Sequence, residues 1–236
     1  VIVTAAMRNP ALTSPDGPGN LLAAVRVACD PWMRRRARAL GVLAVMLDEV
    51  YAVINSGQPP AQMYKSFEAI FARYADVDII ARSALGPAAR QVGAADFAAY
   101  KQAFQGYIGR KYGKRFREFI GSKIEVTGAK KVKSFFAVTS VAYLNGRSPM
   151  EMEWHVSDKS GQSRYFNIII EGVNMLASER AEISAMLTQR GGDITRLQSL
   201  VRHASRLGGQ CGLILWTVLL REQAVVKWAT DRVVHG

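Results

Sequence analysis

The chain has 236 residues, of which 49% are hydrophobic and 21% are charged, a balance typical of a globular protein whose core needs no disulfide staples. The formal net charge of +12 indicates an anionic partner such as nucleic acid, lipid headgroups or an acidic protein, or simply a basic, soluble surface. The two cysteines, Cys29 and Cys211, lie in the flanks, so residues 30–210 offer neither a cysteine metal cluster nor a thiol nucleophile.

Residues 1–47 are predicted to form an unstructured leader. The first part is rich in Pro, Gly and Ala and has no clear period. Residues 33–47 then combine a methionine, four arginines and an apolar run, Ala39–Leu47, which are the parts of a secretory signal peptide. The run is about nine residues long, whereas roughly twenty are needed to cross a bilayer. We therefore expect an export signal or its remnant; the alternative is the start of a buried helix, since no small-x-small cleavage site follows Leu47.

Apolar residues at helical spacing follow, and they predict an N-terminal helical layer. The expected helices cover residues 48–55, 61–74, 76–82 and 94–119. The third should be capped by Asp76, as short acidic side chains commonly do. The fourth contains three glycines within eight residues, Gly106, Gly109 and Gly113. Because each costs about 1 kcal/mol relative to Ala inside a helix, they indicate close packing against another element or, alternatively, a bend that opens a cavity.

The apolar period then changes to two, which predicts strands. They are expected around residues 123–127, 135–144, 150–157 and 163–170, with a hairpin turn at Asn145-Gly146 and a break at Glu171-Gly172. Helices return at 178–187 and 193–203. The order predicts an α+β fold, with a helical N-terminal layer packed on a four-stranded antiparallel sheet and C-terminal helices after it. Residues 48–206 would form this one domain, and residues 207–236 a helical C-terminal extension.

Motifs for catalysis are weak. His155, Glu151 and Glu153 share the polar face of one strand, which is typical of a solvated face. The segment Gly109–Lys114 is one residue short of a phosphate-binding loop and lacks the Ser or Thr that should follow the lysine. The cations of residues 110–117 lie on the helix side opposite the aromatic rings, which argues against stacking on nucleic acid. We assign no catalytic residue, metal ligand or cofactor.

The remaining feature is apolar volume. Met152, Trp154, Ile168 and Ile170 supply one face of the sheet, and Phe104, Tyr107 and Phe116 supply a facing helix. Strand alternation directs Phe166, Ile168 and Ile170 inward, opposite Asn167, Ile169 and Glu171. Such a set usually fills a core, and a ligand cavity is the alternative.

Three segments resemble the phospholipid-binding periplasmic proteins of the toluene-tolerance family, the MlaC type. The first is Tyr74–Gly86, Tyr-Ala-Asp-Val-Asp-Ile-Ile-Ala-Arg-Ser-Ala-Leu-Gly. The second is Phe97–Gly121, with Phe104, Tyr107, Tyr112, Arg115-Phe116 and Gly121 in the family's order. The third is Ile168–Met175, Ile-Ile-Ile-Glu-Gly-Val-Asn-Met, followed by Glu179-Arg180-Ala-Glu182-Ile183. The resemblance covers residues 48–203. The chain departs from the family's pattern at Ala89 and Ser163, where Trp is usual nearby, and at Asn167, where Asp is usual.

The resemblance implies a periplasmic phospholipid carrier without catalytic activity, serving an ABC-type system that maintains outer-membrane lipid asymmetry. The expected partners are phospholipid, an inner-membrane ABC lipid transporter complex and an outer-membrane lipoprotein complex, and not nucleic acid. The acyl chains would lie between sheet and helices, against Phe104, Tyr107, Phe116, Val138, Met152, Trp154, Phe166, Ile168, Ile170, Val173 and Met175. Three alternatives stay open: a carrier of a hopanoid or isoprenoid lipid, a small-molecule enzyme on a cone-shaped α+β fold, and a basic nucleic-acid-binding module.

Overall fold

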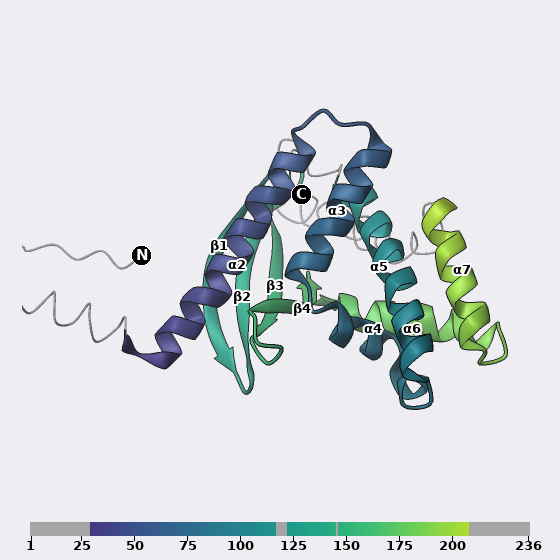
Figure 1. Cartoon of the computed structure of the whole chain (residues 1–236). Coiled ribbons are helices and arrows are strands. Elements are labelled where there is room, and N and C mark those ends of the chain that lie inside the picture. The colour runs from purple at the N-terminus through teal and green to yellow at the C-terminus, as the bar shows by residue number, and fades with distance from the viewer. Residues whose placement is uncertain (1–28, 117–121, 145, 208–236) are drawn as a thin grey trace, which may run out of the picture.

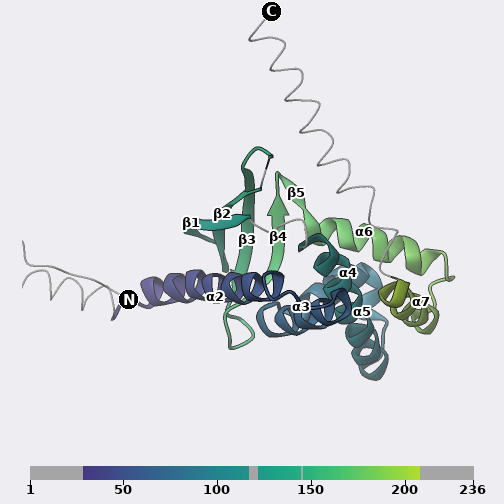
Figure 2. The same cartoon turned by 90° about the horizontal axis from the view of Figure 1, so that it is seen from above.

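The computed structural model describes residues 29–116, 122–144 and 146–207 (Figure 1). The elements follow in the order α2 (Pro31–Ile54), α3 (Pro60–Tyr74), α4 (Val77–Leu85), the 3₁₀ helix η1 (Gly86–Arg90), α5 (Ala94–Phe116), β1 (Lys123–Val132), β2 (Phe135–Tyr143), β3 (Met150–Ser157), β4 (Arg164–Ile170), β5 (Val173–Asn174), α6 (Met175–Thr188) and α7 (Ile194–Leu207). The strands form one antiparallel sheet in the order β1-β2-β3-β4-β5. Figure 2 shows α2 and α3 following one another along one side of this sheet.

The predicted α+β fold is confirmed, with five strands where four were expected. The fifth arises because Glu171 and Gly172, both at positive φ (48° and 77°), turn the chain so that Val173 pairs with Ile170. Asn174 then caps α6, its side chain accepting a hydrogen bond from Ala177 N at 3.1 Å. As a result α6 begins at Met175, earlier than the periodicity indicated.

Helix α2 differs from the expectation of an unstructured leader over residues 31–47. Asp30 caps it by accepting a hydrogen bond from Met33 N at 2.9 Å, and Pro31 occupies the first turn, where a missing N–H costs nothing. Ala39 and Leu43 are buried in the core, so this segment packs as a helix. The export signal over residues 33–47 stays a prediction. Residues 1–28 and 208–236, which hold the rest of both flanks, lie outside the described residues. None of the helices in the described ranges has both the length and the apolar character to span a membrane.

A bulge between β3 and β4 decides which residues face the helices. Met152 pairs with Ile170 and Trp154 with Ile168, but the register then shifts, so that Val156 pairs with Tyr165 and Phe166 is the extra residue. Bulges of this kind re-aim side chains. Tyr165 therefore takes the inner position, where its ring meets Trp154 edge to face at 5.5 Å.

The glycines of α5 bring this helix against α3. A Cβ added at Gly109 would lie 2.8 Å from the Cα of Glu68, and one at Gly113 would lie 3.0 Å from Cδ2 of Phe67. The close-packing interpretation of these glycines is thereby confirmed, and the contact fixes α5 beside α3 (Figure 1).

Candidate functional site

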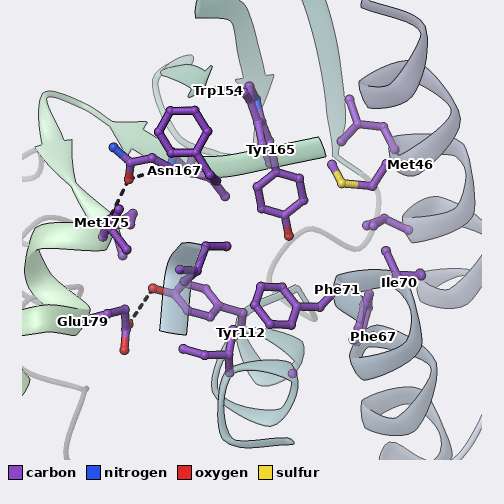
Figure 3. A pocket seen from close by; sticks show the side chains of 18 residues that line it. Met46, Phe67, Ile70, Phe71, Tyr112, Trp154, Tyr165, Asn167, Met175 and Glu179 are labelled. Atoms are coloured by element: carbon purple, nitrogen blue, oxygen red, sulfur yellow. Dashed lines mark hydrogen bonds between the residues drawn. The ribbon is translucent and has the colours of Figure 1, made fainter. Parts of the chain in front are cut away.

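A cavity of about 90 Å³ lies where α2, α3 and α5 approach the inner face of β3 and β4 and the start of α6 (Figure 3). Its wall is made almost wholly of apolar side chains. Helices α2 to α5 contribute Met46, Leu47, Val50, Phe67, Ile70, Phe71, Ile80, Ile108, Gly109 and Tyr112, and the remaining wall is Trp154, Tyr165, Phe166, Asn167, Ile168, Met175, Leu176 and Glu179. The volume is small beside the 300–1,000 Å³ usual for small-molecule pockets.

Most polar groups on this wall are already bonded. The Tyr112 hydroxyl donates to Glu179 Oε1 at 2.7 Å. Asn167 Oδ1 accepts from the backbone N–H groups of Ile168 at 2.9 Å and Leu176 at 3.1 Å, which ties the start of α6 to β4. Because a carboxylate oxygen could accept the same two bonds, Asn can fill the place where the resembling family usually has Asp.

Tyr165 and one oxygen of Glu179 are the exceptions. Glu179 Oε2 is buried without a partner among the described residues. The Tyr165 side chain is about nine-tenths buried, and its hydroxyl points into the space between β4 and the helices (Figure 3). Among the described residues the Tyr165 hydroxyl makes no hydrogen bond, whereas the neighbouring Trp154 donates from Nε1 to Ser140 Oγ at 2.9 Å. Burial raises the pKa of Tyr165 above its usual value, so this hydroxyl stays protonated.

A polar cluster closes the α5–α6 end of the cavity; we define it as Lys111, Glu179, Glu182, Tyr107 and Tyr112. Lys111 Nζ lies 2.7 Å from Glu179 Oε1 and 2.6 Å from Glu182 Oε2, and the Tyr107 hydroxyl donates to Glu182. Glu179 is only 4% exposed. Burial raises its carboxyl pKa, although the Lys111 charge opposes this. The cluster holds α6 to α5.

The family model described as MlaC protein matches residues 45–200. The chain belongs to the MlaC protein family. A second model, for the N-terminal part of asparaginase, matches residues 1–82, about a third of the chain; the described part of that range is α2, α3 and most of α4, packed in the same core as the rest. No curated protein matches the chain.

Among solved structures, this member of the MlaC family is similar to a phospholipid-binding protein from Ralstonia solanacearum, determined in complex with a phospholipid. The two share 15% sequence identity with a TM-score of 0.63, and the match covers 73% of this chain and 99% of the other. At this identity the likeness establishes a shared fold.

The MlaC-family fold brings some of the expected lipid-binding residues together. Trp154, Phe166, Ile168 and Met175 line the cavity. Phe104, Tyr107, Val138, Met152 and Ile170 are buried in the core around it without lining it, and Val173 is partly buried in β5. Phe116 ends α5, and its side chain lies outside the described part of the chain.

The inward assignment of Phe166 is wrong. Although Phe166 borders the cavity, its ring packs on the outer face of the sheet, edge to face with Phe135 at 5.4 Å and beside His155 at 5.7 Å. Simple alternation failed because the bulge reverses the parity of β4 at this residue. Ile168 and Ile170 keep the inward position that alternation gave them.

The wall that α2 and α3 supply was not predicted from the sequence. Met46 and Leu47 were assigned to the leader, and Phe67, Ile70 and Phe71 were recognised only as one apolar helix face. Helical periodicity finds such a face but cannot tell a packed contact from a cavity wall. Among the described residues no cluster of three His, Cys, Asp or Glu could hold a metal ion.

Proposed function

We propose that this protein is a carrier that binds phospholipid with its acyl chains in the cavity. The observation that carries the proposal is a wall built from five helices and two strands that is apolar apart from four residues, Tyr112, Tyr165, Asn167 and Glu179. Each methylene moved from water into such a site contributes about 0.8 kcal/mol. A cavity of this kind can therefore retain a lipid through its tails. The phospholipid-bound neighbour with the same fold supports this choice of ligand.

The size of the cavity makes loading a conformational event. About 90 Å³ is well below the 300–1,000 Å³ of pockets that hold small molecules. The walls must therefore separate as the tails enter. Because α5 is pressed on α3 through Gly109 and bonded to α6 through Lys111, separation between the sheet and the helices disturbs fewer fixed contacts than separation within the helical layer.

The proposal extends to where the carrier works. Membership in the MlaC family supports a periplasmic protein that shuttles glycerophospholipid between inner-membrane and outer-membrane complexes of an ABC-type system maintaining outer-membrane asymmetry. The net charge of +12 favours encounters with anionic membranes or acidic partners.

Lipid analysis of the purified protein tests the proposal. The full chain is expressed in a bacterial host, purified without detergent, extracted with organic solvent and analysed by mass spectrometry. We expect about one phospholipid per protein. An extract without lipid, or one with a polycyclic lipid alone, would contradict the proposal.

A matched pair of variants tests the placement of the tails. Ile168 and Ile169 are neighbours on β4, but Ile168 lines the cavity and Ile169 pairs with Glu153 on the outer face. Ile168→Gln places an amide against the tails, where it loses hydrogen bonds to water, so retained phospholipid should fall by more than half. Ile169→Gln should retain the wild-type amount. Equal retention by both variants would show that the tails lie elsewhere.

A further inference from the structure

The Tyr165 hydroxyl is a hydrogen-bond donor placed among hydrocarbon. It comes from the inner face of β4, below Trp154, and points toward the side chains of Phe71 and Tyr112 (Figure 3). Burying a hydroxyl without a partner destabilises a protein. The Tyr165 hydroxyl is not one of the fully buried polar atoms that lack a partner in the described residues, so it remains accessible from the cavity, and a bound molecule can supply the partner that such groups nearly always have.

The wall offers Tyr165 no acceptor in the described residues. Glu179 Oε1 already accepts from Lys111 and Tyr112, and Asn167 Oδ1 is used by two backbone N–H groups. Glu179 Oε2 has no partner in the described part of the chain, but Glu179 lies at the far end of the wall, beyond Tyr112 (Figure 3). Among the side chains labelled in Figure 3, the hydroxyl points into the space bordered by Phe71, Tyr112 and Met46. A bound water would find few partners here, whereas buried waters typically make about three hydrogen bonds.

We propose that the Tyr165 hydroxyl donates a hydrogen bond to an ester carbonyl oxygen of the cargo, and that the site thereby selects acyl-ester lipids over lipids whose buried part carries no carbonyl. This inference rests on the proposed carrier function and adds the chemical class of the ligand. An ester carbonyl stands at the head of each acyl chain, so a lipid with its tails in the cavity brings an acceptor into the wall. The hydroxyl then gains the partner that the protein itself does not supply.

The other polar atom of the described wall without a partner is Glu179 Oε2; a carboxylate oxygen accepts hydrogen bonds and cannot pair with a carbonyl, so the selection depends on the Tyr165 hydroxyl. A dialkyl ether lipid of the same chain length has the same headgroup and nearly the same shape, but no carbonyl. Binding it leaves the Tyr165 hydroxyl unbonded. A polycyclic or isoprenoid hydrocarbon tail does the same.

Competition between two matched lipids tests this. The full-length protein, stripped of lipid, is offered an equimolar mixture of diacyl and dialkyl phosphatidylcholine with identical chains, and the bound species are counted by native mass spectrometry. One hydrogen bond corresponds to a preference of about 2- to 12-fold for the diacyl lipid. Equal uptake of both lipids overturns the inference and leaves the carrier function standing. Uptake of neither overturns both.

A pair of tyrosine variants assigns the preference to one hydroxyl. Tyr165→Phe should bring the diacyl-to-dialkyl ratio to about one while lipid is still bound. Tyr100→Phe is the matched control, because the Tyr100 hydroxyl has no partner among the described residues and does not line the cavity. Its ratio should stay at the wild-type value. A wild-type ratio that survives Tyr165→Phe overturns the inference, and the wild-type ratio itself depends on no variant's folding.

Discussion

Helix α5 borders two regions that are packed in opposite ways. On its α3 side, Gly109 lets the two backbones approach so closely that a Cβ would lie 2.8 Å from Glu68 Cα. On its other side, toward the sheet, side chains leave about 90 Å³ unfilled. Protein interiors are close-packed, so an unfilled apolar space beside a tight contact marks the place where the fold can yield. The difference indicates that α3 and α5 are the more tightly joined pair, and under the proposed carrier function we expect the seam between helices and sheet to open when lipid enters.

The largest effect should come from breaking the tie between α5 and α6. Lys111→Met removes the cation between the carboxylates of Glu179 and Glu182. Because removing one partner of a buried ion pair leaves an uncompensated charge, we expect a loss of about 3–5 kcal/mol in the free energy of unfolding at neutral pH. Chemical denaturation measures it.

A second lysine on the same helix provides the control for this loss. Lys101→Met removes a half-exposed partner of Asp78 and should cost about 0–1 kcal/mol. Equal losses for the two variants would mean that the polar cluster is no stronger than a surface pair.

The next largest effect should come from the close contact between α5 and α3. Gly109→Ala forces α3 and α5 apart because the new methyl meets the Glu68 backbone, and overpacking of this kind typically costs about 1–3 kcal/mol. Gly106→Ala is the matched change three residues away, where the new Cβ would have only ordinary contacts of 3.6 Å or more. It should stabilise the helix by up to about 1 kcal/mol. Thermal unfolding of both variants would show whether Gly109→Ala lowers the melting temperature and Gly106→Ala raises it.

On the cavity side of α5, added side-chain volume should stabilise the fold instead of destabilising it. Val50→Ile adds one methylene to a residue that lines the cavity, so it should stabilise the fold by about 0.8 kcal/mol and reduce bound phospholipid. Val45→Ile, at an exposed position of the same helix, should leave both unchanged. Denaturation and lipid extraction on the same samples measure the two quantities. A destabilised Val50→Ile variant would show that the space is not available to a side chain.

The same contrast explains what the sequence could predict. The helices and strands follow from the period of apolar residues, and the capping of α4 follows from Asp76, whose side chain accepts from Ile79 N at 3.2 Å. These signals are local. The wall supplied by Met46 and Leu47 was not found because arginines followed by an apolar run suit both an export signal and an amphipathic helix. Only the tertiary packing of Ala39 and Leu43 distinguishes the two.

The inner face of β4 shows a second limit. Alternation placed Ile168 and Ile170 correctly and Phe166 incorrectly, because one bulge residue reverses every side chain that precedes it in the strand. No local signal marks that bulge. It also carries Tyr165 to the cavity, so the residue on which the ligand chemistry depends could not be predicted from alternation.

The smallest expected effect concerns the pH dependence of the polar cluster. Burial raises the carboxyl pKa of Glu179 above its usual value, which is about 4.3 in an unfolded chain. A raised pKa means that the folded state holds this proton more tightly. The stability that it contributes is therefore fully present below about pH 4 and is lost as the pH rises through the folded-state pKa. Glu179→Gln removes this titration.

The difference in unfolding free energy between wild type and Glu179→Gln should accordingly shift in favour of the variant as pH rises from about 4. Denaturant unfolding of both proteins across that range measures the difference, and it cancels the titrations that they share. The groups that face Glu179 are Lys111, Tyr112, Glu182 and Tyr100. The opposite result would be a variant that becomes less stable relative to wild type as the pH rises. It would mean that the Lys111 charge outweighs burial, and that an ionised, paired Glu179 carboxylate stabilises the α5–α6 end of the cavity.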